Sequence, residues 1–437
     1  MTVNSQTGAA ASPTPSASRG WWLVAALFVA AIVSYANRLV LGVLVDPLRA
    51  SFGVSDSAIS LLQGPAFTVI YVLASLPMGR LADRVNRKRL ITLGATTWAI
   101  GATLCGVAPN FNSLLAARIL IGISEATLVP VAISMIADSF ATHRRGTAFG
   151  VFGMATALGG PIGISAGGLL LNAANNGAFG TWPLIGSWAS WRIVLFLFGG
   201  VGMVAPLVLL TVREPRRLET AEPGQSGAAG GFFSRHGKVL VPLYLGCGLL
   251  AIGDYGLVSW APSVLSRRFN WHPDELGLAF GFITAAAGIV GSISGGTLSD
   301  FVERRKGLVG RFQVCLLAAL GAVCAALAIS GPSSFLVLAG VGLWVFISTV
   351  GGIGGLVAIQ SAVPNQYRGL SASVFTFCNT LLGYGCGPTL VAVVTEHVFG
   401  APAAVGYATS AVVAPAAAIA AISFFYAIKR GKIYRAF

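Results

Sequence analysis

Long apolar segments are the feature that most restricts how this chain of 437 residues can fold. Twelve of them are long enough for an α-helix to cross the hydrocarbon core of a bilayer, which takes about 20 residues. The composition agrees, since 55% of the residues are hydrophobic, 10% are charged and the mean hydropathy is +0.79. These values lie outside the range of soluble domains and predict an all-α protein of the lipid bilayer. The predicted helices cover residues 20–46, 58–78, 90–108, 113–137, 146–173, 193–212, 239–265, 277–298, 312–330, 334–360, 370–394 and 402–428.

Positive charges are distributed unevenly around these helices. If the N-terminus is cytoplasmic, all but six of the 28 Lys and Arg residues fall on the cytoplasmic side. The exceptions are two arginines inside predicted helices and four in outer loops: Arg38, Arg118, Arg49, Arg192, Arg267 and Arg268. This positive-inside bias predicts that both termini are cytoplasmic. It explains the net charge of +14 without a nucleic-acid partner, and the Ala- and Gly-rich helices indicate a bacterial inner membrane.

The remaining segments suggest how the chain is divided. Residues 1–19 are rich in Ser, Ala, Thr and Pro, which predicts a disordered cytoplasmic tail. Residues 213–238 are charged, Gly-rich and non-periodic, which predicts a cytoplasmic linker. We therefore expect six-helix bundles over 20–212 and 239–428, and a short tail over 429–437. No metal-ligand spacing, phosphate-binding loop or hydrolase motif occurs, so we expect neither a cofactor nor an enzyme.

The two predicted bundles repeat one another. Gly79, Asp83 and Arg87, just after the second predicted helix, recur 217 residues later after the eighth, in the segment GGTLSDFVERR (295–305). A second pair, RRGTAFGVFG (144–153) and YRGLSASVFT (367–376), recurs at an offset of 223. Both repeats predict two pseudo-symmetric six-helix bundles of parallel topology, an arrangement in which one bundle can rock against the other.

The segment GRLADRVNRKR (79–89) and its later copy resemble the signature loop of the major facilitator superfamily. That resemblance covers nearly the whole chain and implies cytoplasmic contacts that hold the two bundles together in one state. The residues to which it assigns this gating role are Gly79, Asp83, Arg84, Arg87, Asp300 and Arg304. The alternative is that the basic residues only set the topology.

The first bundle also resembles the spinster family. The matching segments are SYANRLVLGVL (34–44), PMGRLADRVNRKR (77–89), ARILIGISEATLVPVAISMIADSF (117–140) and WRIVLFLFGG (191–200) with a following VREP. Spinster-like proteins move lysophospholipids, sphingoid phosphates or other amphipathic anions, so the resemblance implies an anionic, lysolipid-like substrate. In that family the residue before the first-helix Arg is typically Asp, whereas this chain has Asn37 before Arg38. A proton-coupling role cannot be transferred to an asparagine.

Two arginines are predicted at similar depth in the membrane. Arg38 lies in the outer half of the first helix, and Arg118 enters from the outer end of the fourth. An ionisable residue at the centre of a helix costs about 2.5–3.5 kcal/mol, and paired guanidiniums can bind a phosphate or carboxylate bidentately. We therefore predict that Arg38 and Arg118 bind the anionic group of a substrate, with Tyr35 and Asn37 beside them.

Two carboxyl groups are candidates for coupling to protons. Glu125 follows Arg118 by seven residues, so both project from one face of a helix. Loss of water disfavours its charged form and a nearby arginine favours it, which suits a proton switch; a permanent ion pair is the alternative. Asp254 is the pseudo-symmetric counterpart of Asn37 and precedes Tyr255, a further candidate for substrate contact. Its alternative is a hydrogen-bonded residue beside a helix break at neighbouring glycines.

The sequence thus favours a monomeric secondary transporter that moves an amphipathic or organic anion by alternating access, with protons as a possible second partner. A second hypothesis is a proton-coupled uptake symporter for sugar acids or aromatic acids. Without a coupling carboxylate the protein would be a uniporter, and the segment GGPIG (159–163) resembles part of a motif of antiporters. From another class, a membrane receptor could bind the same ligands without moving them.

Overall fold

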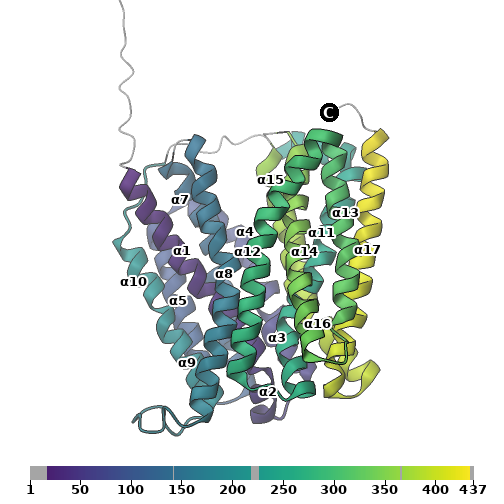
Figure 1. Ribbon diagram of the computed structural model, residues 1–437. Helices are drawn as coiled ribbons and strands as arrows, with labels where there is room; N and C mark the ends of the chain where they lie inside the picture. Colours follow the sequence, from purple (N-terminus) through teal and green to yellow (C-terminus); the bar gives the residue numbers. More distant parts are fainter. Residues whose placement is uncertain (1–16, 141, 218–225, 365–366, 434–437) are drawn as a thin grey trace, which may run out of the picture.

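The computed structural model describes residues 17–140, 142–217, 226–364 and 367–433. Within these residues, twelve helical spans are long and apolar enough to cross a membrane. Each coincides with one of the twelve predicted segments, so the predicted all-α membrane fold is confirmed. Most of the predicted N-terminal tail lies outside the described residues, as do residues 218–225 of the predicted linker and 434–437 of the predicted C-terminal tail, whereas residues 429–433 of that tail are helical. Both ends of the described chain lie on one face of the molecule, which we call the terminal face (Figure 1).

The first bundle contains spans 1 to 6. Several of its helices begin at polar residues whose side chains accept a hydrogen bond from the first turn, as Asn86 does from Arg89 N and Asn110 from Ser113 N. The elements are α1 (Ala17–Leu39), α2 (Leu41–Phe52), α3 (Asp56–Gln63), α4 (Pro65–Arg84), α5 (Arg87–Val107), α6 (Phe111–Glu125), α7 (Leu128–Ser139), α8 (Thr142–Asn175), α9 (Ser190–Gly202) and α10 (Val204–Thr211).

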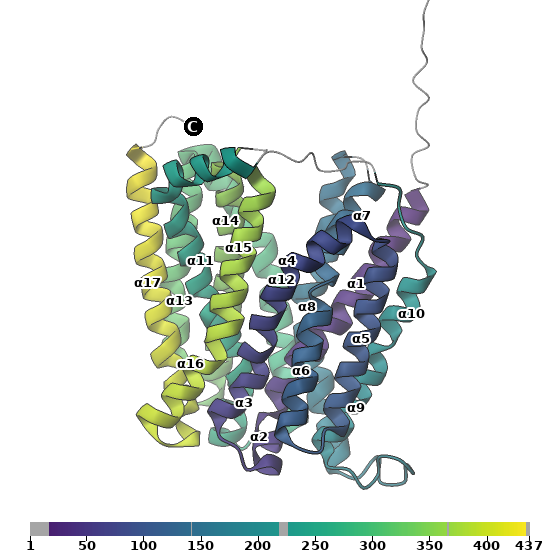
Figure 2. The ribbon, with the colours of Figure 1, turned by 180° about the vertical axis from the view of Figure 1, so that it is seen from behind.

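The second bundle contains spans 7 to 12 and stands beside the first (Figures 1 and 2). Its elements are α11 (Ser226–Phe269), α12 (Pro273–Lys306), α13 (Leu308–Ala328), α14 (Ser334–Ala362), α15 (Arg368–Cys378), the π-helix η2 (Asn379–Cys386), α16 (Gly387–Val394), the π-helix η3 (Thr395–Phe399), the 3₁₀-helix η4 (Pro402–Ala404) and α17 (Val405–Ile433). Helix α11 begins inside the predicted linker, so residues 226–238 are helical and extend span 7.

Several spans are interrupted within the membrane. Span 1 breaks between α1 and α2 at Val40, and span 2 breaks between α3 and α4 at Gly64. Span 4 breaks after Glu125, and span 11 passes through the π-helix η2. A Cβ atom on Gly64 would lie 2.6 Å from the carbonyl oxygen of Tyr384. Glycine at this break therefore allows span 2 to touch η2 of the other bundle.

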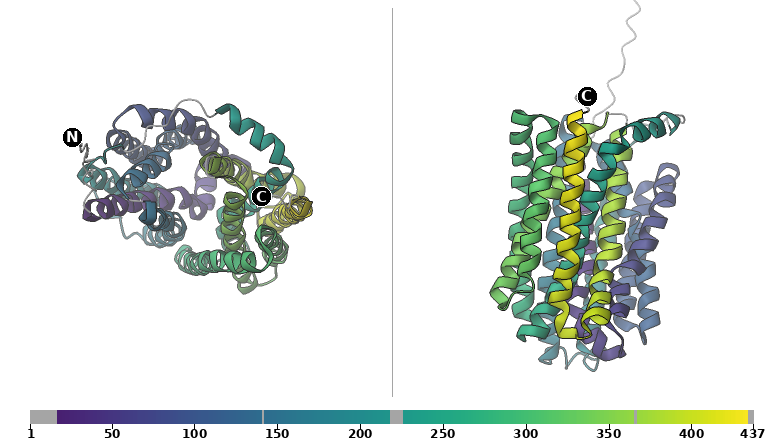
Figure 3. Two further views of the ribbon diagram at one scale, coloured as in Figure 1. Left: turned by 90° about the horizontal axis from the view of Figure 1, so that it is seen from above. Right: turned by 90° about the vertical axis from the view of Figure 1, so that its right-hand side faces the viewer.

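The two bundles pack against each other on the side away from the termini. Helix α8 meets α12 through small residues: Ser165 Oγ donates a hydrogen bond of 2.9 Å to the carbonyl oxygen of Gly277, and a Cβ on Gly168 would lie 2.2 Å from the carbonyl oxygen of Pro273. Small residues permit such close helix contacts in membranes. Helices α2 and α11, α3 and α16, and α4 and η2 also touch there. We call this side the closed face; Figure 3 gives the view from the terminal face.

Candidate functional site

A buried ion pair joins the first and fourth spans. Arg38, near the end of α1, lies 2.5 Å from an Oε of Glu125, the last residue of α6. The other Oε of Glu125 accepts a hydrogen bond from Ser34 Oγ. The side chains of Arg38 and Glu125 are only 10% and 3% exposed. Because two charges removed from water are stable only when paired and hydrogen-bonded, this cluster depends on all three groups.

Four aromatic rings surround the guanidinium of Arg38. Its central carbon lies 4.7 Å from the ring centroid of Tyr35, 4.3 Å from that of Phe67, 5.8 Å from that of Tyr71 and 5.5 Å from that of Tyr384. Cations are attracted to aromatic faces at such distances. Since Tyr384 belongs to η2 and the other rings to the first bundle, Arg38 lies where the bundles meet.

Arg118 lies in a different environment. It is 2% exposed, and its Nε donates a hydrogen bond of 3.2 Å to the carbonyl oxygen of Leu62 in α3. Within the part of the chain that the structure describes, no Asp or Glu pairs with it, and its Nη2 has no hydrogen-bond partner. Arg118 therefore carries a buried positive charge whose counter-ion is not provided by these residues.

Further buried polar atoms on spans 1 and 2 lack partners. They are Asn37 Nδ2, Arg38 Nε, both side-chain atoms of Gln63, and Thr68 Oγ1. Most buried polar atoms in proteins are hydrogen-bonded, and the described residues supply no partner for these. A polar ligand or water is the remaining source of hydrogen bonds.

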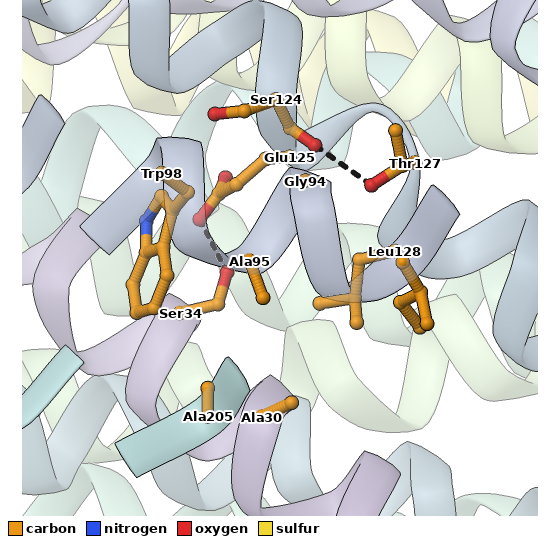
Figure 4. A pocket seen from close by; sticks show the side chains of 11 residues that line it. Ala30, Ser34, Gly94, Ala95, Trp98, Ser124, Glu125, Thr127, Leu128 and Ala205 are labelled. Atoms are coloured by element: carbon orange, nitrogen blue, oxygen red, sulfur yellow. Dashed lines mark hydrogen bonds between the residues drawn. The ribbon is translucent and has the colours of Figure 1, made fainter. Parts of the chain in front are cut away.

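A small cavity lies behind Glu125 inside the first bundle (Figure 4). Its volume is about 20 Å³, enough for one water molecule. Ser34 and Glu125 line it together with Trp98, whose buried indole nitrogen has no partner among the described residues. The carboxyl of Glu125 thus borders this cavity as well as contacting Arg38.

A second cavity lies between the bundles. It measures about 170 Å³ and is lined by α8 and α12 with contributions from α1, α11 and α14. The lining is mostly apolar, for example Leu39, Ile164 and Val345, with the hydroxyl-bearing residues Thr284, Ser292 and Thr349. Leu39 of α1 lines this largely apolar space, whereas Arg38 and Glu125 are not among its lining residues.

Asp254 and Tyr255 lie in the second bundle. Asp254 accepts a hydrogen bond of 2.8 Å from the indole nitrogen of Trp344 in α14. The ring of Tyr255 packs edge-on against Tyr384 at 4.7 Å, which places it next to the rings around Arg38. The expected helix break beside Asp254 was wrong, because α11 is continuous there. Gly253 instead makes room for Trp344, since a Cβ would lie 2.0 Å from that ring.

The predicted gating residues of the first bundle lie at the terminal face. Gly79, Asp83 and Arg84 belong to the last turns of α4, so the predicted loop is largely helical, and the side chain of Asp83 lies outside the described part of the structure. Arg87 is buried at the start of α5. It bonds to Asp138 at 2.5 Å, and to Ser134, Glu214 and Pro215, all within the first bundle or the segment that follows it.

The matching residues of the second bundle also lie in a helix. Asp300 and Arg304 were expected in a loop, but α12 continues to Lys306. Asp300 pairs with Arg311 of α13 at 3.2 Å, and Glu303 pairs with the same arginine. Asp300 and Arg304 also border an open cavity of about 640 Å³ at the terminal face. The ion pairs and hydrogen bonds of both sets among the described residues therefore stay within one half of the chain or the segment that follows it, and α12 is exposed along this cavity.

The closed face holds an ion-pair network that the sequence did not reveal. Arg267, at the end of α11, lies 2.6 Å from Asp46 of α2 and 2.6 Å from Asp56 at the start of α3. Glu396 of η3 accepts hydrogen bonds from the backbone nitrogen of Ser57 at 3.0 Å and from its hydroxyl at 2.5 Å. Charged residues of the second bundle thus hold the first turn of α3.

Sequence reasoning missed this network because Arg267 was counted only as one of the outer-loop arginines. It also missed Gln63, Thr68 and two of the rings around Arg38, Phe67 and Tyr71. A Gln and a Thr within an apolar segment were the only available signals, and neither indicates where its side chain points.

Comparisons with known proteins agree with this architecture. A sequence family described as the Major Facilitator Superfamily matches residues 27–388. An MFS-type efflux pump from Mycolicibacterium smegmatis is 26% identical over 418 residues, covering 94% of this chain and 93% of that protein. A probable galactarate/D-glucarate transporter from Bacillus subtilis is 26% identical over 405 residues, covering 84% of this chain and 85% of that protein.

Among solved structures, a bacterial homolog of the human lysosomal transporter Spinster, in an inward-facing and unoccupied conformation, superposes with a TM-score of 0.74. It is 24% identical in sequence, and the match covers 96% of this chain and 97% of that one. The expected resemblance to this superfamily and to its spinster-like members is confirmed.

Proposed function

The chain belongs to the major facilitator superfamily and is an integral membrane transporter, and we propose that it is a secondary transporter of an amphipathic or organic anion. In this proposal Arg118 binds the anionic group, Glu125 exchanges protons, and the two bundles alternate in exposing the site to either side of a bacterial inner membrane.

The observation that carries the proposal is the unpaired charge of Arg118. A guanidinium buried in a membrane is costly, and removing one partner from a buried ion pair typically costs about 3–5 kcal/mol. A site that keeps Arg118 at 2% exposure without an acidic partner among the described residues suits a ligand that supplies the negative charge. Phosphate and carboxylate groups both match the planar donors of arginine.

The surroundings favour an amphipathic anion. The cavity of about 170 Å³ between the bundles is mostly apolar, and α1, which carries Arg38, contributes Leu39 to its lining. An apolar tail or ring can occupy it while the acidic group approaches the arginines. Tyr35 contacts the guanidinium of Arg38, and Tyr255 packs against Tyr384. Their hydroxyl groups and the amide of Asn37 can form hydrogen bonds, so we include these three residues among the substrate-contacting ones.

The ion pair of Glu125 supports proton coupling. Protonation of Glu125 would release Arg38, which then also becomes available to an anion. Binding of the anion to Arg38 and of a proton to Glu125 therefore favour each other in this arrangement. Asp254 accepts a bond from Trp344 in the second bundle, and its part in coupling is the second possibility to test.

Alternating access is supported by the difference in contacts between the two bundles at the closed face and at the terminal face. Arg267 and Glu396 tie the bundles together on the closed face, whereas α12 is uncovered at the terminal face. If both termini are cytoplasmic, as the distribution of basic residues predicts, this conformation opens inward. Asp83, Arg84, Arg87, Asp300 and Arg304 would then form the contacts of the opposite, outward-open state.

A sugar-acid symporter is the second candidate function. It is favoured by the similarity to a probable galactarate/D-glucarate transporter over most of both chains, and it would use the same arginines. Lysolipids and sugar acids differ in their apolar part, so a competition panel separates the two. A receptor that does not transport would bind these compounds without flux.

Transport into proteoliposomes with an internal pH dye tests the proposal. Arg118→Met is expected to abolish saturable uptake of lysophosphatidate or glucarate, whereas the matched control Arg192→Met, at the closed face outside the site, is expected to transport normally. Glu125→Gln is expected to abolish the accompanying proton flux. Undiminished uptake by Arg118→Met would overturn the anion site, and an unchanged pH signal in Glu125→Gln would move coupling to another residue.

A further inference from the structure

Gln63 is a buried amide with no hydrogen bonds from the described residues. Gln63 is only 3% exposed, and neither its Nε2 nor its Oε1 has a hydrogen-bond partner among the described residues. It is the last residue of α3 and directly precedes the break at Gly64. An apolar residue of the same size would fill this place at lower cost in free energy, because a buried polar group without a partner is destabilising.

Arg118 contacts the helical turn that carries Gln63. Arg118 donates its Nε hydrogen bond to the carbonyl oxygen of Leu62, the residue before Gln63. The guanidinium therefore rests against the same helical turn, with its Nη2 free of hydrogen bonds to the described residues. Thr68, one turn into α4, and Asn37 in α1 add further polar atoms without partners.

The chemistry of an amide restricts what can satisfy it. Glutamine offers a carbonyl oxygen that accepts and an amino group that donates. A hydroxyl group can meet both, because its oxygen accepts and its hydrogen donates. A carboxylate or phosphate can only accept, and the positive charge of Arg118 is the stronger attraction for it.

We propose, on the basis of the function proposed above, that Gln63 binds a hydroxyl group that the transported anion carries near its acidic group. The substrate class is then a hydroxylated anion, such as a sugar acid or the phosphoglycerol head of a lysolipid, and not a simple fatty acid or dicarboxylate. Arg118 supplies affinity for the charge, and Gln63 supplies selectivity for the hydroxyl. A hydrogen bond of this kind corresponds to about a ten- to hundredfold difference in kcat/KM between a substrate and its deoxy analogue.

Matched pairs of probes test this inference in proteoliposomes. One pair is glucarate and adipate, which share six carbons and two carboxylates but differ in hydroxyl groups. The other is 1-oleoyl lysophosphatidate and the analogue that lacks its free hydroxyl. Uptake is measured for wild type, for Gln63→Met, which keeps the length of the side chain, and for the control Gln313→Met, whose residue is half-buried in α13.

The expected result is a preference of at least about tenfold for the hydroxylated member of a pair in wild type and in Gln313→Met. Gln63→Met is expected to take up the deoxy member as wild type does and to lose the preference. Uptake of the deoxy member also shows that this variant is folded.

Three other results would each contradict a different part of the inference. A preference that persists in Gln63→Met, or equal loss of both members, would overturn the role of Gln63 and leave anion transport intact. Equal uptake of both members by wild type would overturn the hydroxylated substrate class. Absence of uptake of all four probes by wild type would overturn the proposed anion transport and this inference with it.

Discussion

The two buried arginines are expected to respond in opposite ways to removal of their charge. Arg118→Met eliminates an unpaired guanidinium, which recovers about 2.5–3.5 kcal/mol on insertion scales. It also loses the bond to the carbonyl of Leu62, worth about 1.5–3 kcal/mol for a charged donor. The two effects together leave this variant between about 0.5 kcal/mol less stable and about 2 kcal/mol more stable than wild type. Arg38→Met instead leaves Glu125 buried without its partner, at a cost of about 3–5 kcal/mol.

Thermal unfolding in detergent measures this difference. A thiol-reactive dye follows unfolding, because its signal rises above the background from exposed Cys324 and partly exposed Cys378 and Cys386 when the buried cysteines become accessible. Arg118→Met is expected to melt near or above the wild-type temperature despite losing transport, and Arg38→Met well below it. If Arg118→Met melted as far below wild type as Arg38→Met, the guanidinium of Arg118 would be paired in the native state and the central argument would fail. The buried reporters are Cys105, Cys247 and Cys315.

Two further predictions concern the contacts between the bundles. Arg267→Gln removes the second-bundle cation that pairs with Asp46 and Asp56. Amide hydrogen exchange in α2 and α3 is therefore expected to accelerate, and to accelerate less in the control Arg267→Lys. Unchanged exchange in both variants would show that these ion pairs do not close this face. Gly64→Ala puts a Cβ at 2.6 Å from the carbonyl oxygen of Tyr384, and overpacking of this kind costs about 1–3 kcal/mol. A lower melting temperature is expected, and an unaltered one would mean that α4 and η2 separate at little cost.

The helical spans were predictable because apolar length is a local property of the sequence. The ends of the helices were harder to predict, as α12 shows. It continues through Asp300 and Arg304 to Lys306, because charged residues do not end a helix where it leaves the membrane. The helix ends at Gly307, whose positive φ of 66° suits glycine. Gly307 is visible in the sequence, and a prediction that ended the helix at this glycine instead of before the charged residues would have been correct.

The buried charges of the candidate site were visible in the sequence, but their pairing was not predictable. The isolated charges of Arg38, Arg118 and Glu125 stand out in apolar segments, and their cost in a membrane indicates function. Which arginine meets Glu125 depends on how spans 1 and 4 are rotated, and on the breaks that interrupt them. The contact of Arg267 with Asp56 joins residues that are 211 positions apart, and nothing local in the sequence specifies it.

Helix α3 connects the ion-pair network of the closed face with the proposed anion site. Its eight residues span about 12 Å. At its first turn, Asp56 and Ser57 are held by the second bundle. At its last turn, backbone carbonyls lack partners within the helix, and Arg118 donates to one of them.

A displacement of α3 would therefore change the contacts at both ends of this helix. Separation of the bundles at the closed face would free its first turn from Arg267 and Glu396. Because α4 is divided from α3 at Gly64, the short helix can tilt without moving the whole of span 2. Such a tilt would shift the carbonyl of Leu62, and with it the guanidinium of Arg118. If the closed face opens as we propose, the break of span 2 at Gly64 would let α3 move Arg118 and so change the proposed anion site, which an unbroken helix would resist.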